Sequence, residues 1–263
     1  MDRDRSKILK FLDYTISSGG KFEDVLAGFS LVRSGKTGHY MACANPHSLV
    51  IASKDAAFKS SLQNADILLP DGAGIVLAAR ILCRPIKERV AGSDFFLGLS
   101  EVAEKEGQLK YFFLGSTQAV LERIQKRLAV DYPSIRLCGV YSPPYKEEFD
   151  DEDNKVMIDL INEARPDVLW VGMTAPKQEK WIFQNRNRLN VPFTAAIGAV
   201  FDFYAGSIER PSERWQRLGL EWLGRFLKEP RRLWQRNLIS MPIFLYWVMR
   251  AKLHNMVARH DSC

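Results

Sequence analysis

The chain has 263 residues, 46% of them hydrophobic, and a formal net charge of +6. This length suffices for one large α/β domain, or one domain plus an appendage, around a substantial buried core. The four cysteines lack CxxC or any other ligand spacing, which excludes a cysteine-based metal motif and favours reduced thiols in a cytosolic protein.

The positive charge is confined to one end of the chain. Residues 1–206 carry 26 Lys+Arg and 26 Asp+Glu, whereas residues 207–263 carry 11 and 5, so the last segment holds the whole excess. A basic tail on a neutral body predicts an anionic partner for the tail: phospholipid headgroups, a lipid diphosphate or nucleic acid.

The first residues, MDRDRSKILKFLDYTISS, are too charged for a signal peptide, and nothing in them suggests export. Apolar residues recur at helical spacing from Ile8 to Ile16. We therefore predict a helix over residues 6–18 that packs on a sheet.

Residues 38–74 organise the rest of the chain. They are expected to form a strand over 39–44, a helix over 47–64 and a buried strand over 67–69. The two strands end in Asn45 and Asp71, and open parallel α/β sheets bind their ligands at the carboxyl ends of their strands. Asp71 is thus the first candidate for chemistry.

The following segments alternate between helices and strands. The helix expected over 72–82 is apolar almost all round and should be buried. A polar loop with Arg89 leads to a helix over 93–106, with Ser93 as its N-cap. The remaining expected strands are 111–114, 135–141, 168–171 and 193–197, and the remaining expected helices are 118–130, 156–164 and 177–187.

Strands separated by helices of this length predict βαβ units with right-handed crossovers. The fold class is therefore α/β: a Rossmann-like, mostly parallel sheet flanked by helices. We assign residues 1–206 to an α/β catalytic domain and residues 207–263 to a basic amphipathic helical appendage.

The appendage has helical spacing, with tryptophans and arginines interleaved. Its most apolar run, residues 238–249, has about 12 residues and contains a proline, fewer than the roughly 20 that span a bilayer. A helix lying on the membrane surface fits better, with Trp and Phe at the acyl boundary and Arg and Lys on the headgroups.

Asp71 and Asn45 each have two interpretations. Asp71 would be a general base held where an acceptor hydroxyl arrives, with Gly72 and Gly74 allowing close approach of a ligand. The alternative is an N-cap of the following helix. Asn45 would hydrogen-bond a sugar or a base, or simply form an Asx-Pro turn.

Two loops that join strands to helices, 115–117 and 172–178, offer backbone N–H groups to phosphate. Neither loop is a P-loop or a full GxGxxG, so a dehydrogenase is not favoured. Arginines could clamp a diphosphate through their planar forks, or form a solvated or lipid-facing basic surface. These arginines are Arg89, Arg225, Arg231, Arg232 and Arg236.

Two patterns raise the question of a metal. Residues 151–153 match the DxD sequence of many sugar-nucleotide enzymes, but they follow no buried strand and open a helix in an acidic loop. The four histidines have no ligand spacing, and His47 is expected to cap a helix. We predict no metal site and no cofactor.

Four sequence motifs, in this order along the chain, carry a family resemblance. They are PDGAG at 70–74, ERVAG at 88–92, APKQEKW at 175–181 and GLEWLGRFLKEPRR at 219–232. In combination they resemble the WecG/TagA/CpsF family of bacterial glycosyltransferases over most of the chain.

The resemblance implies inverting, metal-independent transfer of a sugar from a UDP-sugar to a polyprenyl diphosphate-linked sugar, in the synthesis of surface polysaccharide or teichoic acid. Glucose, N-acetylmannosamine and its uronic acid are all plausible donor sugars. The enzyme would be cytoplasmic and peripheral on the inner face of the cell membrane, docked through residues 207–263. Away from the membrane, an exposed apolar tail would favour homo-oligomers.

The resemblance also assigns residue roles. Asp71 would be the catalytic base, and Asn45 would line the pocket for donor and acceptor. Cys43 stands where many relatives have Thr, which puts a hydroxyl contact there in doubt. The donor would be contacted by Arg89, Gln178 and Asp202, and its diphosphate by Arg225, Arg232 and a third tail arginine, Arg236, unless the register places Gln235 there.

Two other classes of function compete with the enzyme. A catalytically inert, membrane-associated protein could bind nucleotide-sugars in the same pocket. A nucleic-acid binder is disfavoured because the body is neutral and the tail's tryptophans are mixed with Leu, Ile and Phe, as at a bilayer edge.

Overall fold

The structure is a computed structural model that describes residues 8–207 and 234–260. The strands are β1 Ile8–Phe11, β2 Tyr14–Ser17, β3 His39–Ala44, β4 Ile67–Pro70, β5 Lys110–Gly115, β6 Arg136–Tyr141, β7 Val168–Gly172 and β8 Phe193–Ala196. The helices are α1 Lys21–Val32, α2 Pro46–Ala52, α3 Ala56–Gln63, α4 Ala73–Ile81, α5 Gly92–Glu106, α6 Gln118–Asp131, α7 Asp151–Ala164, α8 Lys177–Asn185, α9 Val200–Tyr204, the π-helix η2 Gln235–Ser240 and α13 Met241–His260.

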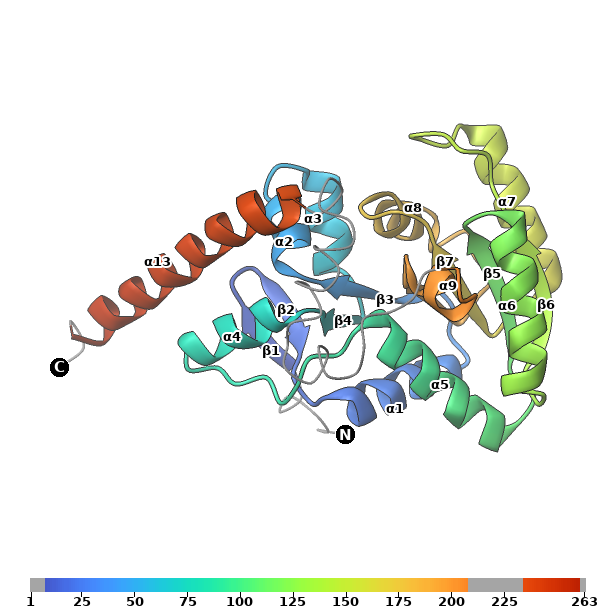
Figure 1. Cartoon of the computed structure of the whole chain (residues 1–263), viewed down its shortest axis with the longest axis horizontal. Helices are drawn as coiled ribbons and strands as arrows, with labels where there is room; N and C mark the ends of the chain where they lie inside the picture. The colour runs from blue at the N-terminus through green and yellow to red at the C-terminus, as the bar shows by residue number, and fades with distance from the viewer. Residues whose placement is uncertain (1–7, 208–233, 261–263) are drawn as a thin grey trace.

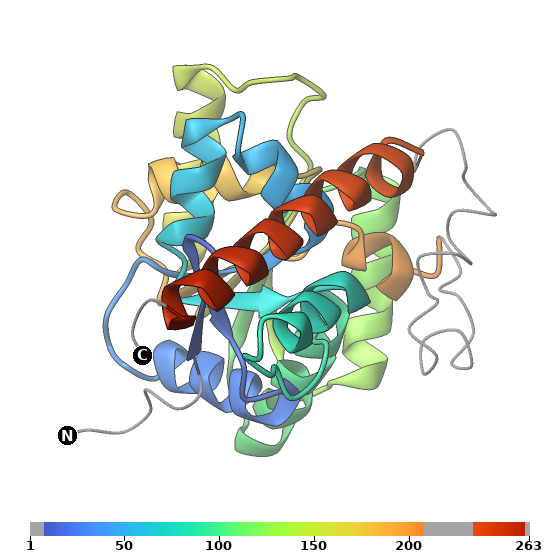
Figure 2. The same cartoon turned by 90° about the vertical axis from the view of Figure 1, so that its left-hand side faces the viewer.

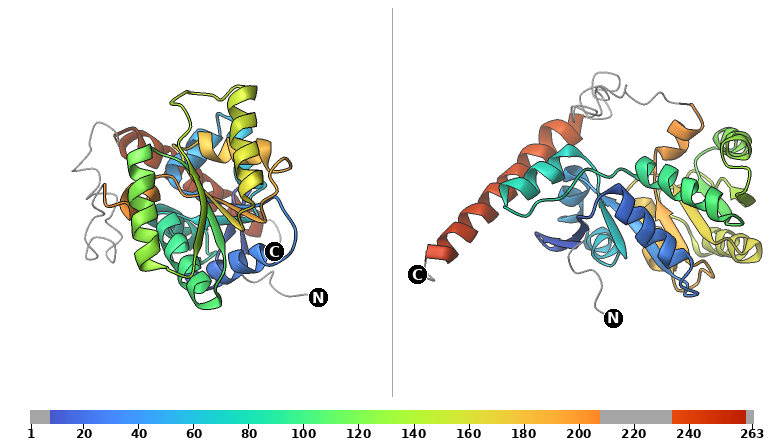
Figure 3. Two further views of the ribbon diagram at one scale, coloured as in Figure 1. Left: turned by 90° about the vertical axis from the view of Figure 1, so that its right-hand side faces the viewer. Right: turned by 90° about the horizontal axis from the view of Figure 1, so that it is seen from below.

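Six strands form the central sheet in the order β4-β3-β8-β7-β5-β6, and each pairs with its neighbours in parallel. The predicted α/β fold with a mostly parallel sheet is confirmed. Helices cover both faces, with α1, α5, α6 and α9 on one side and α2, α3, α7 and α8 on the other (Figure 1 and Figure 3, left).

Side-chain alternation along the strands explains this three-layer arrangement. Met41 and Phe113 pack into the core under α1, α5, α6 and α9, whereas their neighbours Tyr40 and Phe112 pack under α7 and α8. Because both faces are covered, the inner strand β7, VLWVG, reads as a continuous apolar run. Trp170, fully buried, lies edge-on to Phe96 with the ring centroids 4.9 Å apart.

The helix predicted over residues 6–18 is wrong, because residues 8–17 form a β-hairpin, β1-β2. Phe11 pairs with Tyr14, and Leu12 in the turn has a φ of 52°. Tyr14 and Ile16 are buried while Thr15 is exposed, which is the period of a strand with one covered face. The apolar residues fit both periods, and burial of one face accompanies the strand: Phe11, Tyr14 and Ile16 lie in one core cluster with residues of α2, α3, α4 and α13.

Several helix boundaries also differ from the prediction, and α7 begins at Asp151 rather than at residue 156. The helix expected over 47–64 is divided into α2 and α3, because Asp55 Oδ1 accepts the Phe58 N–H at 2.9 Å and caps a new helix. Helix α5 begins at Gly92 with Ala91 as its N-cap, and Asp94 Oδ2 accepts the Ala91 N–H at 3.0 Å. Ser93 therefore lies inside the first turn.

Helix α4 is less buried than its composition predicts. Ile75, Ala78 and Ala79 are buried, but the side chain of Leu77 is 52% exposed. The helix therefore has one face on the core and one open, although it carries almost no polar residue to mark the open face.

The C-terminal helix α13 crosses the hairpin, α2 and α4 on the outside of the sheet (Figure 2). Phe244 and Val248 are fully buried in one cluster with Phe11, and the Phe11 and Phe244 ring centroids lie 6.2 Å apart. The division of domains at residue 206 stays a prediction. In the described residues we find no helix with the length and apolar character that crossing a membrane requires.

Candidate active site

The residues predicted for the site follow four adjacent strands, β4, β3, β8 and β7, at their carboxyl ends. Asn45 comes directly after β3 and Asp71 directly after β4. The Asp71 N–H donates to Ala44 O at 2.8 Å, which fastens the two strand ends together. The structure thus places the two candidates from the 38–74 segment side by side.

Asn45 is the N-cap of α2. Its Oδ1 accepts the Ser48 N–H at 3.0 Å, and Ser48 Oγ accepts the Asn45 N–H at 2.8 Å, so both halves of a capping box are present. This cap uses only the carbonyl oxygen of the amide. Within the described residues the Nδ2 group makes no hydrogen bond, and it can donate to a ligand.

Asp71 is not the N-cap of the next helix. That position belongs to Gly72, so the alternative interpretation of Asp71 is not realised. Gly72 has a φ of 106°, which favours glycine, and a Cβ there would lie 3.8 Å from Asn45 Cβ. The turn therefore holds the half-buried Asp71 close to Asn45.

Cys43, near the end of β3, carries a thiol that the protein keeps protonated. Burial raises its pKa well above the ordinary value, and the negative charges of Asp71 and Glu179 raise it further. Its Sγ is 3.9 Å from Ala196 O. Cys43 is therefore a neutral thiol rather than a thiolate nucleophile.

Arg89 is carried by the loop between α4 and α5. The Val90 N–H donates to Pro70 O at 3.2 Å and ties this loop to the end of β4. The Arg89 guanidinium lies 3.5 Å from Asp94 Oδ2, and both side chains are about a quarter exposed, at 23% and 24%. A cation is therefore held next to the strand that delivers Asp71.

Gln178 and Asp202 lie in the first turns of α8 and α9, the helices that follow β7 and β8. Gln178 is 5% exposed; its Oε1 accepts the Met173 N–H at 3.1 Å, and its Nε2 lies 3.5 Å from where a Cβ on Gly198 would be. Asp202 is half-buried in the short helix α9, which follows Gly198. The parallel sheet thus gathers Asn45, Asp71, Gln178 and Asp202 at one edge.

Three predicted tail residues cannot be placed. Arg225 and Arg232 lie outside the described residues, as does the side chain of Arg236. The tail nevertheless reaches the site region at its described part, because His47 Nδ1 lies 2.8 Å from Ser240 Oγ. The expectation that His47 caps a helix is thus replaced by a contact with the appendage.

Sequence reasoning missed Glu179. It is 2% exposed, and its Oε2 makes no hydrogen bond in the described part of the chain. Desolvation raises the pKa of this carboxyl to about 7. A signal was present, because Gln178, Glu179, Ile182 and Asn185 share helical spacing, and all four are buried.

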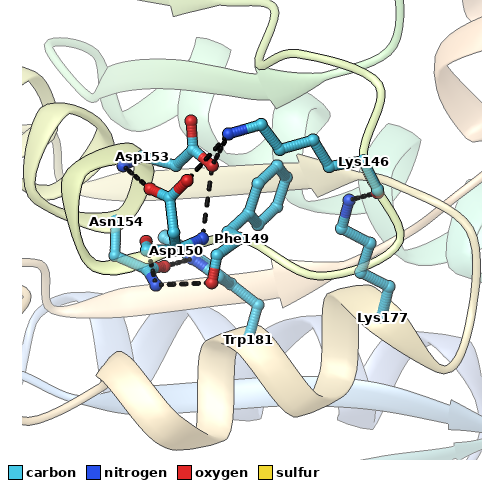
Figure 4. A network of polar contacts seen from close by, with 7 residues as sticks. All are labelled: Lys146, Phe149, Asp150, Asp153, Asn154, Lys177 and Trp181. Carbon is cyan, nitrogen blue, oxygen red and sulfur yellow. Dashed lines mark hydrogen bonds and ion pairs between the residues drawn. The ribbon is translucent and has the colours of Figure 1, made fainter.

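The DxD sequence at the start of α7 is occupied by internal contacts (Figure 4). Asp153 Oδ2 accepts from Lys146 Nζ at 2.6 Å and from the Asp150 N–H at 3.2 Å. Lys177 donates to Lys146 O and lies 3.6 Å from the Phe149 ring centroid, so the loop before α7 docks on the first turn of α8. Among the described residues no cluster of three or more His, Cys, Asp or Glu side chains could hold a metal ion.

The chain is similar to several known proteins. A protein of Bacillus spizizenii named N-acetylglucosaminyldiphosphoundecaprenol N-acetyl-beta-D-mannosaminyltransferase is 30% identical over 213 residues, which cover 81% of this chain and 79% of that protein. A Staphylococcus aureus protein of the same name is 29% identical over 81% of this chain and 80% of its own length. The sequence profile of the glycosyl transferase WecG/TagA/CpsF family matches residues 10–257. The chain therefore belongs to the WecG/TagA/CpsF family of glycosyl transferases.

Proposed function

We propose that this glycosyltransferase moves N-acetylmannosamine from a UDP-sugar to a polyprenyl diphosphate-linked N-acetylglucosamine, with inversion, in the synthesis of a surface polysaccharide or teichoic acid. The names of the relatives favour this sugar over glucose or the uronic acid. The observation that carries the proposal is the placement of Asp71 beside Asn45 at the carboxyl edge of the sheet.

In this mechanism Asp71 accepts the proton of the acceptor hydroxyl as that oxygen bonds to the anomeric carbon. The bond from the anomeric carbon to the diphosphate oxygen breaks on the opposite face, and UDP leaves with the electron pair. One carboxylate suffices for such a single displacement. The neutral Cys43 thiol supports this route, since it provides no thiolate that would compete for the anomeric carbon.

The leaving diphosphate carries the negative charge that develops in the transition state. Arg89, held near β4, is placed to offset it, and the tail arginines Arg225, Arg232 and Arg236 would add charge from the appendage. The Asn45 Nδ2 group, Gln178 and Asp202 would orient the donor, with the Cys43 thiol as a weak donor where relatives have a hydroxyl.

The appendage would bring the enzyme to its lipid substrate as a peripheral protein on the inner face of the cell membrane. Helix α13 buries Phe244 and Val248 on the body and leaves Tyr246, Met249 and Leu253 exposed, at 64%, 50% and 60%. These three apolar side chains recur at intervals of three and four, which places them on one outward face of the helix.

The test is Asp71→Asn with UDP-N-acetylmannosamine and a short-chain lipid diphosphate N-acetylglucosamine. Loss of the base should lower the rate of UDP release by about 10²–10⁴-fold while UDP affinity, measured by calorimetry, stays unchanged. Asp159→Asn, on the exposed surface of α7, is the matched control. If the wild-type protein binds UDP but releases none from the donor, the inert nucleotide-sugar-binding alternative replaces the enzyme.

A further inference from the structure

Glu179 is a buried carboxylate next to a residue of the proposed donor site. It occupies the first turn of α8, directly after Gln178, and its Oε1 accepts a hydrogen bond from Gln178 Nε2 at 2.8 Å. The other oxygen, Oε2, has no partner within the described residues. A buried carboxylate with one unpaired oxygen costs folding free energy, and a neutral side chain of the same size would avoid that cost.

The carboxylate fixes the orientation of the Gln178 amide. As it stands, Gln178 Oε1 accepts from Met173 N–H and Nε2 donates to Glu179. A flipped amide would turn its NH₂ group toward the Met173 N–H, donor against donor, and its oxygen toward Glu179, acceptor against acceptor. A neutral glutamine at position 179 could match either orientation and would leave the Met173 N–H as the one contact of this pair that selects the observed orientation, so the carboxylate supplies the second contact that selects it.

The fixed amide in turn holds the loop after β7. Met173 begins this loop and Gln178 lies in the first turn of α8, directly after it, so the hydrogen bond between them ties the start of the loop to the helix that follows. On its other side the amide packs against Gly198, where a Cβ would lie 3.5 Å from Nε2 and 3.6 Å from Oε1. The conformation of the backbone after the carboxyl ends of β7 and β8 thus depends on the orientation of the Gln178 amide.

We propose that Glu179 is a positioning residue, whose carboxylate locks the Gln178 amide and the 173–178 loop in the conformation that receives the sugar-nucleotide donor. This inference rests on the proposed function, because the donor contact of Gln178 is part of it. Glu179 itself does not touch substrate in this arrangement; it acts through Gln178.

The experiment compares Glu179→Gln with the wild-type protein. We expect kcat/KM for the UDP-sugar to fall by about tenfold, mainly through KM, which corresponds to one charge-assisted hydrogen bond. The Tm should stay equal or rise, because the buried charge is gone. A residue with a merely structural role would instead lower Tm and activity together. Glu163→Gln, exposed on α7, is the matched control and should change neither quantity.

A double-mutant cycle with Gln178→Ala tests whether Glu179 acts through its neighbour. In the Gln178→Ala background, Glu179→Gln should have no further effect on the UDP dissociation constant. Additive effects, or wild-type kcat/KM in Glu179→Gln, overturn the inference. A wild-type protein that transfers no sugar overturns the proposed function instead. The inference about Glu179 is then still decided by the UDP dissociation constants of the four proteins of the double-mutant cycle, measured by calorimetry.

Discussion

At the scale of single residues, two buried carboxyl groups have raised pKa values for the same reason, which is desolvation. Desolvation raises the pKa of Glu179 to about 7 and that of Asp24 to about 6. Each has one oxygen without a hydrogen bond in the described part of the chain, although Ser17 Oγ donates to the other oxygen of Asp24. Glu179 lies at the site, whereas Asp24 lies in α1, where Glu88 and Glu23 add to the rise of its pKa.

These raised pKa values predict how stability depends on pH. The folded protein binds a proton at Asp24 up to about pH 6, whereas the unfolded chain releases it near the ordinary value of 3.8. The stabilisation that comes from the protonated Asp24 is therefore fully present below about pH 4 and is lost as the pH rises toward 6. Asp24→Asn, which keeps an acceptor for Ser17, should remove this loss.

For Asp24→Asn we expect a gain of roughly 1–3 kcal/mol in the free energy of unfolding at pH 7, shrinking toward zero below pH 4. Urea unfolding at a series of pH values measures it. Glu106→Gln, exposed at the end of α5, serves as the control and should show no such trend. A gain that is the same at every pH would contradict a buried, titrating Asp24.

Some site residues can be predicted from the sequence alone and others cannot. Asn45 and Asp71 can be predicted as site candidates because each follows an apolar strand directly, which is a local pattern. Burial of Glu179 could not be predicted with the same assurance, since a glutamate in a polar helix start is usually solvated. Only the packing of α8 against the strand ends takes it out of water.

At the scale of elements, caps decide boundaries that hydrophobic periodicity leaves open. Asp55 separates α2 from α3, because its side chain accepts the Phe58 N–H and caps the start of α3. Its Oδ2 also lies 3.3 Å from Lys180 Nζ. The Phe58 N–H is the first cause of the lowered pKa of Asp55, followed by hydrogen bonding to Lys180. Asp55 therefore stabilises the fold above the ordinary Asp pKa, and this contribution is lost as the pH falls through the lowered value.

Two substitutions separate the cap from the charge. Asp55→Ala should lower the free energy of unfolding by about 1 kcal/mol or somewhat more, because both the cap and the ion pair are lost. Asp55→Asn keeps the cap and should cost only a few tenths of a kcal/mol. Thermal unfolding at pH 7 distinguishes them. Equal losses in the two variants would mean that the Lys180 ion pair, rather than the cap, dominates.

At the scale of the whole molecule, the appendage is joined to the body by its last helix. Phe244 and Val248 belong to the same core cluster as the hairpin residue Phe11, and His47 contacts Ser240 beside the site. Deleting residues 207–263 would therefore remove part of a core as well as the proposed membrane-binding surface. A sharper test changes only the outward face of α13.

Tyr246→Glu combined with Leu253→Glu should abolish flotation with anionic liposomes and slow transfer to a long-chain lipid acceptor. UDP affinity and Tm should change little, because both side chains are exposed. Val130→Glu, on α6 with the side chain 80% exposed, is the matched control. Undiminished flotation of the double variant would refute docking through α13, and retention on DNA in place of liposomes would support the nucleic-acid alternative.

The sequence by itself determined the alternation of strands and helices, the α/β class, and the polar residues at the ends of β3 and β4, because these depend on hydrophobic periodicity and on neighbouring turn residues. Only the tertiary structure decided the strand order, the hairpin at residues 8–17 and the burial of Glu179 beside Gln178. Each of these depends on contacts between segments far apart in the chain. Local pattern does not encode such contacts, since the same apolar spacing satisfies a helix until a partner such as α13 covers one face of a strand.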